Sequence, residues 1–185
     1  MSKRALIPIA AVSALGASAP AAAAQTINVA GGDVGGHVSS IGDFRPSSDP
    51  TIAAARRAFG RPSSRTRTSE LSCDVRWSRL RLRITFTNFG GVGPGESICD
   101  DGASSAQTFA VRGPRVRTWR GLRVGQREER VLERHPSAEF RRGRWWIKTT
   151  RSLVGGGGEF PVVDATVTEA GRIKAIRGWI GAAGD

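Results

Sequence analysis

The 185-residue chain lacks tyrosine and has only one methionine, two histidines and two cysteines. A structural zinc site normally takes four closely spaced ligands. His37 and His135 are too far from Cys73 and Cys99 in sequence to complete such a set. The sequence also lacks G-x-S-x-G, H-E-x-x-H and the phosphate-binding P-loop. We therefore predict no metal, no cofactor and no catalytic residues, so that the chain is not an enzyme.

Carboxylate pairs are equally scarce. Asp100 and Asp101 are adjacent, and such a pair can serve general acid–base catalysis or bind calcium. They lie in a glycine- and serine-rich stretch, where we expect both side chains to be solvated. Glu159 and Asp164 are isolated in the sequence.

Only one apolar run approaches the length of a membrane span, residues 5–24. It follows a short basic start, is broken by two prolines, and ends in Ala22 and Ala24, the small-x-small pattern that signal peptidase accepts. We predict a signal peptide over residues 1–24 and a secreted, extracytoplasmic protein with no membrane span after cleavage. An uncleaved N-terminal anchor is the alternative.

Export determines how the two cysteines are interpreted. Outside the cytoplasm a lone pair of cysteines is most often a disulfide. We therefore predict a bond between Cys73 and Cys99. In the loop-entropy view it contributes about 3.5 kcal/mol to the free energy of unfolding.

Negative charge is also in short supply. The chain has 28 lysine and arginine residues, nearly all arginine, against 16 acidic ones, which gives a net charge of +12. Such an excess is typical of a surface that meets an anionic partner. A GC-rich genome, which enriches arginine, alanine and glycine without any binding role, would produce the same composition.

Helix and strand signals fall into two halves. Residues 25–42 are glycine-rich, and we predict a flexible leader there, with one added strand over residues 26–30 at most. A first helix is predicted from Asp49 as N-cap to Gly60, and strands follow it. In these strands Cys73, Val75 and Trp77 alternate inward, and Leu80, Leu82, Ile84 and Phe86 alternate in the opposite phase.

The second half repeats this plan. A helix is predicted within residues 121–136, followed by strands around residues 145–150 and 163–175. Because a short helix must bury its apolar stripe on a sheet, we predict an α+β fold of two tandem αβββ repeats. They would share an antiparallel sheet, with the helices on one face. The first repeat would span residues 43–114 and the second residues 115–185.

The repeated phrase resembles a known family. RRAFGRP with CDVRW, and GLRVGQREERVLERHP with RWWIKT, each combine a glycine, a short helix, a proline stop and a tryptophan strand. This pattern resembles the repeat of the small outer-membrane assembly lipoproteins of the BamE/SmpA type and of the β-lactamase inhibitor protein. The resemblance covers about residues 43–181 and implies two repeats in one long curved sheet that binds a partner.

The chain also departs from that family. The inhibitor has a disulfide in each repeat, whereas both cysteines here lie in the first half, and the lipoproteins' lipidated cysteine is absent. Nothing corresponds to the inhibitor's active-site-plugging loop, and tyrosine, frequent on binding faces, is missing. The chain is similar overall to exported proteins of actinobacterial composition, which implies no function.

The candidate contact is the stretch FRRGRWWIKTTR, residues 140–151. It interleaves Trp145 and Trp146 with basic residues, namely Arg141, Arg142, Arg144 and Lys148. Adjacent residues on a strand point to opposite faces, so one tryptophan enters the core. The other would lie under covering elements or form an open platform ringed by guanidinium groups.

These features predict a secreted, non-catalytic binding protein that acts by surface recognition of an exported protein, in the manner of an inhibitor. One alternative is an envelope-associated module that binds an anionic cell-wall polymer. A secreted hydrolase with scattered catalytic residues is another. Export argues against nucleic acid as the partner.

Overall fold

A computed structural model describes residues 24–151 and 158–181 of the chain. The predicted signal peptide lies outside the described residues except for Ala24. The helices are α1 (Ile52–Phe59) and α2 (Arg130–Arg134). The strands are β1 (Gln25–Ala30), β2 (His37–Ile41), β3 (Ser64–Ser69), β4 (Ser72–Trp77), β5 (Leu82–Thr87), β6 (Ser105–Val111), β7 (Val116–Thr118), β8 (Glu139–Arg141), β9 (Arg144–Arg151), β10 (Glu159–Val167) and β11 (Ile173–Trp179).

Eight strands form one antiparallel sheet in the order β3-β4-β5-β6-β11-β10-β9-β8. The two ends of this order are four-stranded meanders, which meet where β6 pairs with β11 in the centre. The predicted phases of β4 and β5 are confirmed, because Cys73 pairs with Phe86 and Val75 with Ile84, and all four side chains are buried. This alternation gives the large sheet an apolar inner face.

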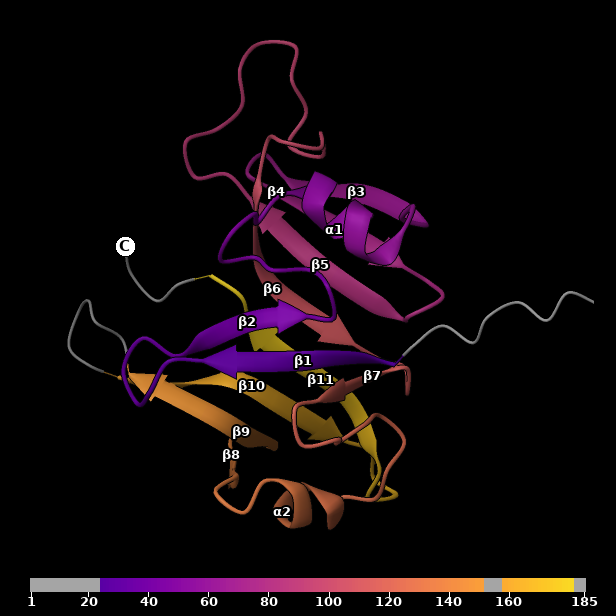
Figure 1. Cartoon of the computed structure of the whole chain (residues 1–185), viewed down its shortest axis with the longest axis vertical. Coiled ribbons are helices and arrows are strands. Elements are labelled where there is room, and N and C mark those ends of the chain that lie inside the picture. The colour runs from indigo at the N-terminus through magenta and orange to yellow at the C-terminus, as the bar shows by residue number, and fades with distance from the viewer. Residues whose placement is uncertain (1–23, 152–157, 182–185) are drawn as a thin grey trace, which may run out of the picture.

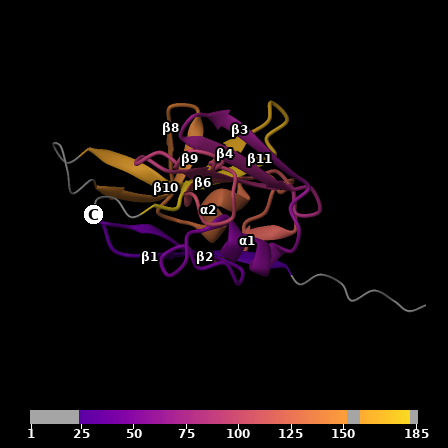
Figure 2. The same ribbon diagram turned by 90° about the horizontal axis from the view of Figure 1, so that it is seen from above.

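A second sheet of three strands, β2-β1-β7, lies over that inner face (Figures 1 and 2). Residues 25–42 were predicted to be a flexible leader with at most one strand, over residues 26–30. That strand corresponds to β1, and the same stretch also supplies β2, which was not predicted. Ile27, Val38 and Ile41 are fully buried there and belong to the main core. Burial of these three side chains offsets the entropy of ordering the glycine-rich stretch between the strands.

Helix α1 lies beside the small sheet and covers one end of the large one (Figure 1). Its N-cap is Thr51, whose hydroxyl accepts from the Ala54 N–H at 3.2 Å. Asp49, the predicted N-cap, instead accepts from the Thr51 hydroxyl at 2.6 Å. This bond is the main reason why the pKa of Asp49 is lowered. Gly60 ends the helix with a φ of 80°, as the sequence predicted.

Helix α2 is much shorter than the sequence predicted. Only Arg130–Arg134 is helical, although helical spacing suggested most of residues 121–136. Gly121 and Gly125 adopt φ values of 82° and 89°, which are incompatible with a right-handed helix. The Gly125 N–H instead donates to the Ile173 carbonyl, so this stretch is tied to β11.

The predicted fold class is therefore wrong. The described residues are mainly strands, with a large sheet and a separate small one in place of two αβββ repeats that share a sheet beneath their helices. Helical spacing alone does not predict a helix here, because short amphipathic stretches that are broken by glycine satisfy this spacing without forming helices. Neither helix in the described ranges has the length and apolar character required to cross a membrane.

Candidate functional site

The large sheet presents a polar outer face on the side away from the small sheet (Figure 2). Strand registers align one row of outer-face residues across its eight strands. In sheet order this row is Ser64, Arg76, Arg83, Ala110, Arg177, Asp164, Trp146 and Glu139. Side chains at such cross-strand positions are neighbours, so the row places charged groups from both halves of the chain on one surface.

Two buried aspartates organise the charge on this face, one in each meander. Asp74 accepts from Arg83 at 3.2 Å and from the Thr85 hydroxyl at 2.7 Å. Asp164 accepts from Arg144 at 3.3 Å and from Arg177 at 2.7 Å. Arg144 and Arg177 share Asp164, and its carboxylate neutralises much of the positive charge at the β8–β11 end of the sheet.

Positive charge is less well compensated at the β3–β6 end. A pocket of about 480 Å³ opens at the turn between β4 and β5. Four arginines line it: Arg76, Arg81, Arg83 and Arg112. Only Arg83 has a carboxylate within 4 Å among the described residues. Ala110 also lines the pocket, and its small side chain leaves space between Arg83 and Arg177 in the outer-face row.

The backbone at this pocket is strained. Arg81 has a φ of 50°, a left-handed conformation that a residue with a side chain adopts at a cost of about 1–2 kcal/mol. Gly113 lies against it, and a Cβ built on Gly113 would be 2.9 Å from the Arg81 Cβ. The Arg81 carbonyl accepts from the Arg112 N–H at 2.9 Å, which fixes the two arginines side by side.

Neither predicted tryptophan forms an open platform. Trp145 is half-buried, packs against the main core, and donates through Nε1 to Glu128 at 2.6 Å. Trp146 points to the outer face but is 5% exposed. The Arg141 guanidinium lies 5.2 Å from its ring centre. Trp146 Nε1 is buried and has no acceptor among the described residues.

The predicted basic residues do not form one free cluster. Arg141 pairs with Glu139 and Glu159, and the hydrogen bonds to these carboxylates raise its pKa. Arg144 is bound to Asp164, and Arg142 lies exposed in the β8–β9 turn. Lys148 is half-buried and pairs with the core residue Val163. The register between β9 and β10 shifts between this pair and the Trp146–Asp164 pair, so alternation does not place Lys148 on the face of Trp146.

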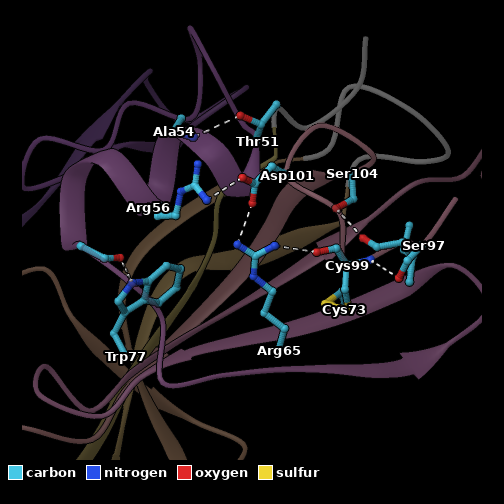
Figure 3. Close-up of polar contacts among 12 residues, drawn as sticks. Thr51, Ala54, Arg56, Arg65, Cys73, Trp77, Ser97, Cys99, Asp101 and Ser104 are labelled. Atoms are coloured by element: carbon cyan, nitrogen blue, oxygen red, sulfur yellow. Dashed lines mark hydrogen bonds and ion pairs between the residues drawn. A yellow bond between two sulfur atoms is a disulfide. The ribbon is translucent and has the colours of Figure 1, made fainter.

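The predicted disulfide between Cys73 and Cys99 is present. It ties β4 to the long connection between β5 and β6 (Figure 3). Asp101 reinforces this attachment, since it accepts from Arg56 at 2.9 Å and from Arg65 at 2.6 Å. Asp101 is therefore an ion-pair centre rather than the solvated side chain that was expected.

His135 is 2% exposed and contacts Thr118, with 2.8 Å between Nε2 and the hydroxyl oxygen. Burial, with a smaller contribution from Arg120, lowers the pKa of His135 to about 4. The imidazole is therefore uncharged at neutral pH. The other histidine, His37, is far from His135 in the sequence. Within residues 24–151 and 158–181, no group of three or more histidine, cysteine, aspartate or glutamate side chains could hold a metal ion.

Sequence reasoning missed the arginine pocket. Period-two alternation by itself would place Arg79, Arg81 and Arg83 on the outer side of one strand, whereas β5 begins at Leu82 and the first two lie in the turn. Arg112 joins the pocket because β6 pairs with β5. The positive surplus in the composition was the available signal, but it does not locate the site.

Comparison with known proteins leaves the family open. No family model matches the chain, and no curated protein matches it. A similar solved structure is an extracellular protein containing a SCP domain from Bacillus anthracis str. Ames, at 13% identity and a TM-score of 0.37. The match covers 68% of this chain and 41% of that chain, so this chain spans less than half of that protein's length.

Proposed function

We propose that this chain is a secreted, non-catalytic binding protein that recognises an anionic polymer of the cell envelope through the outer face of its large sheet. The observation that carries the proposal is the pocket at the β4–β5 turn, where three of four arginines have no carboxylate within 4 Å among the described residues. Uncompensated guanidinium groups on an open surface attract polyanions.

The character of the face favours this partner over an apolar protein surface. The hot spots of a hydrophobic interface are exposed aromatic anchors. On this face Trp146 is covered, and its neighbours in the row are Asp164 and Glu139. A charged and hydrated surface of this kind suits a flexible polyanion, because binding then releases counterions.

A salt titration tests the proposal. We expect the purified protein to be retained on an immobilised polyanion at low ionic strength and released steeply as NaCl rises. The double variant Thr66→Glu/Arg76→Glu places negative charge on the outer face and should weaken retention several-fold. Arg127→Glu/Ser137→Glu changes the net charge equally outside that face and should weaken it less. Equal weakening by the two variants would remove the face from the proposal.

A second candidate is an exported protein bound in the manner of an inhibitor. It is favoured by Phe89, which is 78% exposed on the connection between β5 and β6. The disulfide and Asp101 anchor this connection to the body of the protein, and an anchored apolar side chain suits insertion into a partner's pocket.

Affinity capture from culture medium separates the two candidates. An inhibitor-like protein should capture a defined exported protein in high salt and lose it on Phe89→Ser. Leu132→Ser, at a residue 46% exposed on α2, is the control. Trp145→Ala and Trp146→Ala test the contact predicted from the sequence. If the three test variants, like the Leu132→Ser control, still capture what the unmodified protein captures, the inhibitor-like candidate is wrong.

A further inference from the structure

The pocket at the β4–β5 turn has features of a specific subsite as well as of a general basic surface. We propose that Arg76, Arg81, Arg83 and Arg112 form a site for a phosphoryl group, the repeating anionic unit of a phosphate-ester polymer. The inference rests on the proposed function and deepens it, because it names the chemical group that is recognised.

The arginines of the pocket repel one another in the free protein. Arg76 and Arg83 are directly opposite each other on β4 and β5, and like charges at such cross-strand positions destabilise a sheet. Asp74 is bound to Arg83 but not to Arg76 among the described contacts. A bound anion would relieve this repulsion, so part of the binding energy is already stored in the free protein.

The four arginines reach the pocket from different elements of the sheet. Arg76 comes from β4, Arg83 from β5, Arg81 from the turn between them, and Arg112 from the end of β6. A tetrahedral phosphoryl group presents oxygens in several directions and can accept from more than two guanidinium groups, whereas a planar carboxylate is filled by one or two. Each unit of such a polymer is a phosphodiester with a single negative charge, so successive units along the polymer would together supply the charge that several free arginines require.

The backbone at the pocket is held in a strained conformation. Arg81 is held in a left-handed conformation against Gly113, and its carbonyl is bonded to the Arg112 N–H. Strained residues of this kind tend to occur at binding sites, where the surrounding structure maintains them. Here the strained residue, Arg81, lines the pocket together with Ala110.

The test uses inorganic phosphate as the free probe and poly(glycerol phosphate) as the polymer. Arginine Nε–H resonances of the full protein are followed by NMR during titration with phosphate, and with acetate at equal ionic strength. We expect saturable shifts with phosphate and none with acetate. Arg76→Gln/Arg81→Gln/Arg112→Gln should lower the phosphate affinity at least about tenfold. The control Arg45→Gln/Arg127→Gln/Arg134→Gln removes the same charge elsewhere and should leave the affinity within about twofold.

Retention on poly(glycerol phosphate) and on poly-L-glutamate of equal charge separates this inference from the proposed function. Preference for the phosphate polymer, lost only in the pocket variant, supports the subsite. Equal retention on both polymers, with equal loss in both variants, overturns the subsite and leaves general polyanion binding standing. Absence of retention on either polymer overturns the proposed function, while the phosphate titration still decides whether the pocket binds the free anion. Melting temperatures confirm that both triple variants are folded.

Discussion

At the scale of single residues, the buried imidazole of His135 is the group through which we expect acid to destabilise the fold. The unfolded chain binds a proton on this histidine near pH 6.5, whereas in the folded protein its pKa is about 4. The free energy of unfolding should therefore fall as the pH is lowered through this interval, by about 3 kcal/mol in total. Urea unfolding of the wild type and of His135→Gln between pH 7 and pH 4 measures the difference. Parallel pH profiles would show that other groups are responsible.

Arg81 allows stability and binding to be separated at one position. Glycine adopts a φ of 50° without strain. Arg81→Gly should therefore raise the free energy of unfolding by about 0.5–1 kcal/mol, after the greater flexibility of the unfolded chain is deducted. The same change should weaken phosphate binding. Arg81→Gln keeps the strain and should weaken binding without stabilising the protein. Denaturant unfolding and phosphate titration of both variants measure the two effects. An Arg81→Gly protein that is less stable than the wild type would contradict the prediction.

At the scale of secondary-structure elements, Gly178 permits the contact between the two meanders. It lies in β11 opposite Phe109 of β6, at the central pairing of the sheet. A Cβ on Gly178 would lie 2.5 Å from the Phe109 ring and 2.5 Å from the Val162 carbonyl oxygen. Gly178→Ala should lower the free energy of unfolding by about 2 kcal/mol. Gly32→Ala, where a Cβ meets nothing within 4 Å, is the matched control for thermal unfolding. Equal melting temperatures would contradict the prediction.

The connection between β5 and β6 depends on its covalent attachment. The Cys73–Cys99 bond spans a sequence separation of 26 residues, for which loop entropy gives a contribution of about 3.5 kcal/mol. The variant Cys73→Ala/Cys99→Ala should lose about that much stability in calorimetry. Asp101→Asn should lower the free energy of unfolding by less, because the Asp101 side chain is a third exposed and solvent screens its ion pairs. If the cysteine variant melts with the wild type, the bond has no stabilising role.

The elements also show what could be predicted from the sequence. Alternation placed Cys73, Val75, Ile84 and Phe86 correctly on one face, because period two is a local property of a strand. The cysteine pairing followed from the composition and the expected compartment. The long helix predicted within residues 121–136 was wrong because the hydrogen bond from the Gly125 N–H to β11 is non-local. Only the pairing of β5 with β6 brings Arg112 to Arg81, and no sequence pattern encodes that neighbour.

At the scale of the whole molecule, the net charge of +12 has two explanations that stability measurements can separate. Eight arginines have a carboxylate within 4 Å in the described part of the chain, and the arginines that have none repel one another. Raising NaCl from 20 to 500 mM screens that repulsion. It should raise the melting temperature by about 3 °C whether the arginines reflect genome composition or function.

Phosphate distinguishes the two explanations. If the surplus charge is compositional, 10 mM phosphate should act on the protein as the same ionic strength of NaCl does. If the pocket binds phosphate, the anion stabilises the folded state by linkage, and the melting temperature should rise with the logarithm of its concentration above the dissociation constant. Arg76→Gln/Arg81→Gln should abolish this additional rise and keep the response to NaCl, because the general screening involves all the other arginines. A phosphate response that survives in the double variant would mean that the anion acts on the whole charged surface, and the pocket would then have no special part in it.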